Sequence, residues 1–203
     1  MIMKALNKET QSQITPDRAI EMLLDGNKRF LENNFLNRDY NSQVDDTSSG
    51  QYPFAAVLSC IDSRVPVELI FDQGIGDIFS ARVAGNIVNE DMLGSIEYAC
   101  KVAGSKLILV LGHSKCGAVT AACKNVELGN ITALLSKIKP AVESCSGIEF
   151  DDAGIEQVIV ENVKKSIDCI RKDSPLLLEM ETNNEIKIAG AVYDVSSGHV
   201  KLL

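Results

Sequence analysis

The sequence of 203 residues has no tryptophan, only two histidines, and no cysteine pair spaced as Cys-x-x-Cys. The missing pair excludes a thioredoxin-like redox site. No apolar run approaches the length of a membrane-spanning helix, and the first residues lack the apolar core of a secretory signal. We therefore expect a cytoplasmic protein without a membrane partner.

Positive charge is also scarce, because 20 Lys and Arg stand against 28 Asp and Glu and the formal net charge is −8. Affinity for nucleic acids comes largely from Lys and Arg on phosphates. No basic block occurs anywhere along the chain. The charge therefore predicts a protein that has no nucleic-acid partner, with a solvated acidic surface.

Apolar runs of strand length alternate with helical patterns after the first quarter of the chain. The predicted strands cover residues 54–59, 78–83, 106–111 and 186–193, and a turn at 196–198 would allow a short terminal strand. Helices are predicted over residues 65–71, 89–103, 131–145, 153–170 and 176–180. This alternation predicts an α/β fold with a mainly parallel sheet flanked by helices.

The segment before this domain is predicted to be an amphipathic helical arm with its connection, so that residues 1–50 precede a catalytic α/β domain at 51–203. Thr15 and Pro16 are typical of a helix start. Residues 37–50 are polar and are expected to form an exposed connection. The apolar side chains of the arm recur at helical spacing, at Ile20, Leu23, Leu24, Phe30 and Leu31. Such a stripe needs a surface to cover.

Two polar segments each follow a predicted strand. Residues 60–64 (CIDSR) come after the first strand, and residues 113–117 (HSKCG) come after the third. In open sheets of parallel strands, ligands bind outside the carboxyl ends of the strands. If these two strands are neighbours, both segments converge at one edge of the sheet, where chemistry is expected.

The segments carry the ligands of a zinc site, with two thiolates from Cys60 and Cys116 and an imidazole from His113. A structural site would normally add a fourth Cys or His, so the count favours an open, catalytic zinc site. Asp62 and Arg64 could form a surface ion pair of little energetic value. Beside a metal, however, a carboxylate held by a guanidinium can orient a bound water. The remaining cysteines are interpreted as small hydrophobic side chains, at Cys100, Cys123, Cys145 and Cys169.

These motifs resemble those of the β-class carbonic anhydrases. The resemblance covers both metal segments and three further motifs, at residues 26–30 (GNKRF), 83–86 (VAGN) and 95–99 (SIEYA). It implies reversible hydration of carbon dioxide to bicarbonate and a proton, by a zinc-bound hydroxide that Asp62 and Arg64 orient. It also implies that Asp62 either pairs with Arg64 or becomes the fourth metal ligand and closes the site.

The resemblance further implies a substrate pocket that a partner subunit completes. Gln51 matches the glutamine that hydrogen-bonds substrate, and Phe79 and Tyr98 match aromatic residues that line the pocket. Val83 and Gly117 are the remaining candidates for contact with substrate. A homodimer or a dimer-based tetramer is expected, with the arm laid across the partner so that its apolar stripe is covered.

One departure from the resemblance is informative. A subgroup with a second, inhibitory bicarbonate site has tryptophan three residues before the first metal cysteine, where this chain has Val57. We therefore expect that regulatory site to be absent. Two alternatives to carbon dioxide hydration stay open: hydrolysis of carbonyl sulfide or carbon disulfide, and a zinc-stabilised binding or shell protein without turnover. No proton shuttle is evident, because His199 is distant from the motifs.

Overall fold

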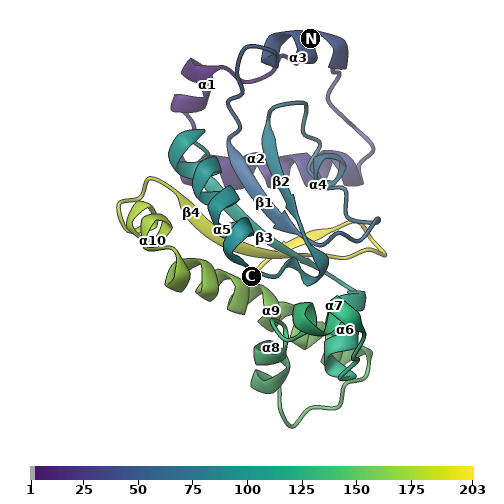
Figure 1. The fold of residues 1–203 in the computed structure, drawn as a ribbon. Helices are drawn as coiled ribbons and strands as arrows, with labels where there is room; N and C mark the ends of the chain where they lie inside the picture. Colours follow the sequence, from purple (N-terminus) through teal and green to yellow (C-terminus); the bar gives the residue numbers. More distant parts are fainter. Residues whose placement is uncertain (1–2) are drawn as a thin grey trace.

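The computed structural model describes residues 3–203, and its centre is a five-stranded sheet with the order β2-β1-β3-β4-β5 (Figure 1). Residues 1–2 of the expected arm lie outside the described residues. Four strands are parallel and the last pairs antiparallel with β4. The strands are β1 (Ala55–Ser59), β2 (Ile78–Arg82), β3 (Leu107–His113), β4 (Lys187–Tyr193) and β5 (Val200–Leu202). The predicted mainly parallel sheet is confirmed.

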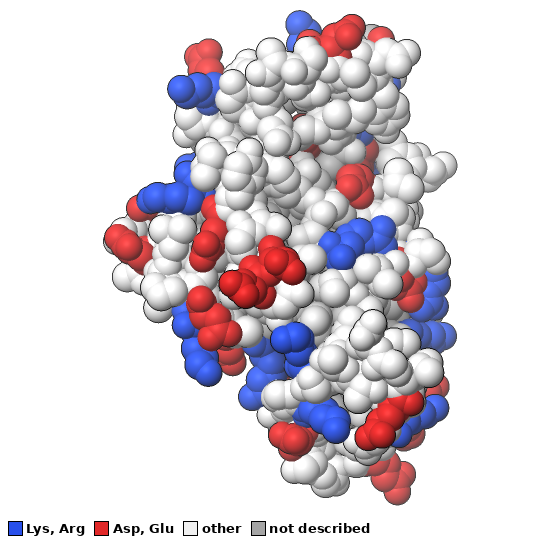
Figure 2. Space-filling view, viewed as in Figure 1, with Lys and Arg blue, Asp and Glu red and all other residues white. Residues whose placement is uncertain are grey.

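Helices cover both faces of this sheet. They are α1 (Lys8–Ser12), α2 (Pro16–Leu31), α3 (Tyr40–Thr47), α4 (Val67–Ile70), α5 (Glu90–Glu97), α6 (Gly117–Cys123), α7 (Gly129–Leu135), α8 (Lys139–Ser144), α9 (Asp152–Asp173) and α10 (Pro175–Thr182), with a 3₁₀ turn η1 (Ala84–Asn86) and a π-helical turn η2 (Tyr98–Val102). Among the described residues, no helix is long and apolar enough to cross a membrane. Acidic and basic side chains are interspersed on the face shown in Figure 2.

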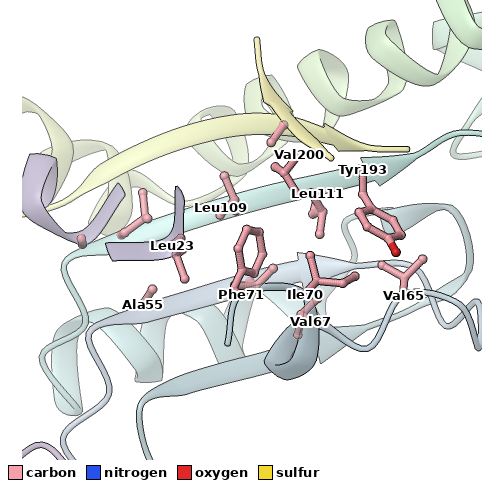
Figure 3. Close-up of a cluster of buried hydrophobic side chains, with 14 of the residues drawn as sticks. Leu23, Ala55, Val65, Val67, Ile70, Phe71, Leu109, Leu111, Tyr193 and Val200 are labelled. Carbon is pink, nitrogen blue, oxygen red and sulfur yellow. The ribbon is translucent and has the colours of Figure 1, made fainter. Parts of the chain in front are cut away.

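One face of the sheet packs against α2 and α4. Side chains alternate along a strand, so Leu109 and Leu111 of β3 point to this face while Val110 points to the other. Figure 3 shows Leu23 from α2 and Phe71 beyond α4 in the same apolar layer as Leu109. Both Leu23 and Phe71 are fully buried or nearly so. The layer therefore fixes α4, which directly follows the segment that carries Cys60 and Asp62.

The opposite face packs against α5, η2, α9 and α10. Beyond the carboxyl ends of β1 and β3, the helices α6, α7 and α8 gather against α9 around a third apolar cluster, seen at the bottom of Figure 1. Cys60 and Cys116 belong to this third cluster. The carboxyl edge of the sheet is therefore walled by helices on the side where the predicted metal segments emerge.

Several predicted boundaries were wrong, each for a local reason. The helix predicted over 131–145 divides into α7 and α8, with Pro140 in the first turn of α8, because proline cannot continue a preceding helix. The connection predicted over 37–50 contains α3, which Asp39 caps by accepting a hydrogen bond from Ser42 N–H. The short helix α6 was not predicted.

The chain's own core supplies part of the surface beneath the arm. Helix α2 begins at Pro16 with Thr15 as its cap, as predicted. However, Ala19 and Leu23 pack into the core of their own chain, where they are 0% and 1% exposed. Asn27 adds hydrogen bonds to the carbonyl oxygens of Ile70 and Gly198. Leu23 is the one member of the predicted stripe that the chain buries fully. Ile20, Leu24 and Phe30 are half-buried and Leu31 is exposed, so the expected contact with a partner stays a prediction.

Candidate metal centre and active site

The sheet brings three predicted ligands to one point. Cys60 directly follows β1, His113 ends β3, and Cys116 is the N-cap of α6. Because β1 and β3 pair in parallel register, their carboxyl ends share one edge. One ligand atom from each residue lies within 4.8 Å of the other two, and all three residues are buried. Among the described residues, no other group of three or more His, Cys, Asp or Glu meets this spacing.

The imidazole of His113 is oriented as a metal ligand. Its Nδ1 lies 2.9 Å from the carbonyl oxygen of Ser114, and since that oxygen can only accept, the ring proton belongs on Nδ1. The lone pair is then on Nε2, which is buried and has no hydrogen-bond partner among the described residues. Metal-binding histidines typically donate their second ring N–H to a carbonyl or carboxylate in this way. A metal ion would satisfy the unpaired nitrogen.

The two sulfurs lie within 4.8 Å of each other, and each changes the pKa of the other. The hydrogen bond from the Cys116 thiol is the main cause that lowers the pKa of Cys60 to about 4. The same hydrogen bond, together with burial, raises the pKa of Cys116 far above its usual range. The interaction therefore favours a thiolate on Cys60 and a proton on Cys116. A divalent cation would take the place of that proton, since thiols deprotonate on binding a metal.

Two groups outside the cluster hold the Cys60 segment. The N–H of Gly85 in η1 donates to Cys60 Sγ at 3.3 Å. Arg82, the last residue of β2, donates to the carbonyl oxygens of Cys60 and Asp62 at 3.0 and 2.6 Å. The metal segment is thus tied to the β2–η1 connection on both its side chain and its backbone. Neither hydrogen-bonding group was predicted. In the sequence, Arg82 stands only in a predicted strand, and Gly85 only in the VAGN motif.

Asp62 and Arg64 form a two-pronged ion pair beside the cluster. Arg64 Nε donates to Asp62 Oδ1 at 2.9 Å, and an Nη donates to Oδ2 at 2.8 Å. These bonds hold the pKa of Asp62 well below its usual range, so the carboxylate is ionised at neutral pH. Asp62 Oδ2 lies 3.9 Å from His113 Nε2. The carboxylate is therefore adjacent to the ligand group while being held by the guanidinium.

The predicted aromatic pair lies away from this cluster within one chain. Phe79 and Tyr98 contact edge to face, with ring centroids 6.2 Å apart, in a hollow of about 750 Å³ between β2 and α5. Phe79 is in register with Ala56, four residues or about 13 Å along the strand from Cys60. Tyr98 is 50% exposed. The two rings form an open apolar surface at the edge strand.

The other predicted substrate residues are placed as follows. Gln51 is exposed and precedes β1, whereas Cys60 follows it, so the two residues stand at opposite ends of that strand. Val83 is partly buried and packs between two core clusters. Gly117 is the first residue of α6, directly after the ligand Cys116. The structure therefore does not bring Gln51, Phe79 and Tyr98 to the metal ligands of the same chain.

Taken together, the donors fit a catalytic metal site. Two sulfurs and an imidazole would hold a metal ion and leave room for a further ligand, and an ionised carboxylate stands next to the three donors. A structural site would close that position with a fourth Cys or His. This fold and donor set fit the class of α/β enzymes with a Cys₂His metal centre.

Comparisons with known proteins agree with this class. Residues 55–200 match the carbonic anhydrase family. The chain is 32% identical over 196 residues to carbonic anhydrase 2 of Mycobacterium tuberculosis, covering 92% of each chain. The β-carbonic anhydrase CafA of Aspergillus fumigatus superposes with a TM-score of 0.73 at 26% identity over 79% of each chain. A tetrameric β-carbonic anhydrase of Sordaria macrospora gives a TM-score of 0.72 at 26% identity, covering 78% of this chain and 84% of that one. The chain belongs to the carbonic anhydrase family and is an enzyme of its β class.

Proposed function

We propose that this chain hydrates carbon dioxide reversibly to bicarbonate and a proton, with Zn²⁺ held by Cys60, His113 and Cys116. The observation that carries the proposal is the buried, unpartnered Nε2 of His113 beside two sulfurs and the ionised Asp62. Two thiolates and one imidazole are a ligand set that zinc accepts in catalytic sites. When bound, the metal supplies the Lewis acidity that makes water ionise near neutral pH.

The chain's own residues would hold and aim the reactants. Asp62, kept ionised by Arg64, accepts a hydrogen bond from the attacking water and turns its lone pair toward carbon dioxide. Arg64 also occupies both carboxylate oxygens and so keeps Asp62 from turning into the ligand group. Holding the nucleophile in one orientation removes part of the entropic barrier.

We further propose that a second copy of the chain supplies the apolar and amide groups for substrate. Gln51, Phe79 and Tyr98 are too far along the sheet from their own Cys60 to share a pocket with it. They are exposed or line an open hollow, so they are available to another subunit. The tetrameric β-carbonic anhydrases of Sordaria macrospora support an assembly of several copies, and we propose that it is built from dimers.

The same reading gives roles to the two parts of the chain. Residues 51–203 would be the catalytic α/β domain, and residues 1–50 the arm and connection that complete its core. We also propose a cytoplasmic location, which six free thiols within the described residues support, because oxidising compartments favour disulfides.

A stopped-flow carbon dioxide hydration assay tests the proposed activity. Protein with about one zinc per chain should be active, chelation should abolish turnover, and added zinc should restore it. Cys116→Ser, which loses a ligand, is the matched inactive control. Zinc-loaded protein that hydrates carbon dioxide no faster than this control would refute the proposal.

Mixing two inactive variants tests the shared site. Cys116→Ser removes the metal half, and Gln51→Ala removes part of the substrate half. If partners share each site, a mixed dimer contains one site with both halves intact, so activity should reappear when the variants are unfolded together and refolded. No recovery, with mixed dimers verified by mass, would place both halves in one chain.

A further inference from the structure

Two polar residues interrupt the apolar face that α9 turns toward the sheet. The apolar members of this face are Ile155, Val158, Ile159, Val163 and Ile170. Asn162 and Ser166 take positions on the same face one turn apart, and they are only 2% and 5% exposed. Burying an amide is unfavourable unless it finds a hydrogen-bond partner. Their partners therefore show why polar side chains are placed here.

Both residues reach the turn η1, which touches the metal ligand Cys60. Asn162 Nδ2 donates to the carbonyl oxygen of Gly85 at 2.8 Å, and Ser166 Oγ donates to that of Asn86 at 3.1 Å. The N–H of Gly85 donates in turn to Cys60 Sγ at 3.3 Å. A short chain of hydrogen bonds thus runs from the middle of α9, through a single residue, to a metal-binding sulfur.

Gly85 has no side chain, so only contacts of its backbone, such as the hydrogen bond from Asn162, can hold its position. Its φ of +68° lies in the left-handed region that favours glycine. A Cβ at this position would lie 2.6 Å from Ile138 Cδ1, so the site admits no larger residue without a shift. The N–H of Gly85 lies in the peptide shared with Ala84 and its carbonyl in the next peptide. By holding that carbonyl, Asn162 limits how far Gly85 can rotate and so restrains the N–H.

We infer that Asn162 is a positioning residue, which aims the Gly85 N–H at Cys60 Sγ and so sets how strongly the Cys60–His113–Cys116 group binds its metal. This inference rests on the proposed function, since it concerns the same site. A hydrogen bond to a ligating sulfur fixes its orientation and shares its negative charge. Partners of metal ligands typically change metal affinity or activity by about 10–100-fold when they are lost.

The test measures metal binding directly. Metal-free protein is titrated with Zn²⁺ against a competing chelator, and with Co²⁺ while the sulfur-to-cobalt absorption band is recorded. Asn162→Leu keeps the branched shape of the side chain and removes the amide, and Asn162→Ala is the second variant should the bulkier leucine prevent folding. Ser166→Ala is the matched control, since it removes the neighbouring hydrogen bond of η1 without touching Gly85. Thermal unfolding of the metal-free proteins measures the purely structural effect.

Both Asn162 variants should bind Zn²⁺ about 10–100-fold more weakly and shift the cobalt band, whereas Ser166→Ala should change affinity less than about threefold. Equal affinities and bands for the unmutated protein and either folded Asn162 variant would overturn the inference. So would an equal loss in Ser166→Ala, because a general loosening of η1 would then explain the effect. An unmutated protein that binds no Zn²⁺ would instead refute the proposed function on which the inference rests.

Discussion

Arg64→Ala should separate catalysis from metal binding. Arg64 contributes no ligand atom, so zinc content should stay near one per chain. Of the three hydrogen bonds that Arg64 donates to Asp62, the substitution removes the two from the guanidinium and leaves the one from the backbone N–H to Oδ1. Oδ2 has no other donor among the described residues, so it is released 3.9 Å from His113 Nε2.

A released carboxylate beside a cation is expected to turn toward it, which would occupy the fourth position and displace the water. Loss of a preorganised group of this kind typically lowers turnover by about 100–1,000-fold, and we expect a loss of that size in kcat/KM. The kcat/KM of Arg64→Lys should lie between those of the unmutated protein and Arg64→Ala, because an ammonium cannot bind both carboxylate oxygens as a fork.

The assay for this series is stopped-flow hydration with zinc content measured on the same samples. The cobalt spectrum of Arg64→Ala gives a second readout, since a new oxygen ligand changes the absorption of the metal. If Arg64→Ala keeps full zinc and stays within about threefold of normal kcat/KM, Arg64 does not control Asp62 and the pair is structural.

Three further predictions concern the ligands and the core. Cys116→Ser should lose most of its zinc, measured by metal analysis, because a neutral hydroxyl replaces a thiolate poorly. Metal binding at about pH 6.5 should release about one proton per ion, because the low pKa of Cys60 favours its thiolate while Cys116 keeps its proton. Calorimetry in buffers of different ionisation enthalpy measures this number. A release of about two protons would mean that both thiols were protonated before binding. Leu23→Ala should lower the free energy of unfolding by about 3 kcal/mol and the Tm by about 6–12 °C, because Leu23 is buried. Leu31→Ala, at an exposed site of the same helix, should lower both much less. Equal shifts in Tm would contradict the packing of α2 on its own sheet.

The grouping of Cys60, His113 and Cys116 could be predicted because its signal is local. Cys60 and His113 each sit at the end of an apolar run, and the rule that parallel strands place ligands at their carboxyl ends brings them together. Asp62 and Arg64 are two residues apart, so their pairing needs little from the rest of the fold. The sheet was predictable for the same reason, since buried parallel strands are continuous apolar runs.

The supports of the site were not predictable, because they arise from contacts between distant segments. Arg82 lies 22 residues from Cys60, and Asn162 lies 77 residues from Gly85. In the sequence, Asn162 is only a polar residue within an apolar stripe. Such a pattern indicates that the side chain makes a buried hydrogen bond, but it does not identify the partner. The stripe on α2 likewise indicated that a surface was needed, without indicating that the chain's own core takes up Leu23.

The positions of Gln51 and the Phe79–Tyr98 pair have a consequence for how activity depends on concentration. Strand β1 is only five residues long, yet Gln51 precedes it and Cys60 follows it, so these groups cannot close on each other without breaking the sheet. Tyr98, which lines the hollow at the edge strand, is 50% exposed, and Val102 of the same turn η2 is 70% exposed. Exposed apolar patches of this kind mark interaction surfaces. If a second copy covers them, the metal half of one chain meets the substrate half of another. Specific activity should then fall together with the dimer fraction on dilution, while zinc stays bound to each chain. Activity that is constant across the dissociation of the dimer, followed by mass photometry, would contradict the shared site and leave the metal centre proposal intact.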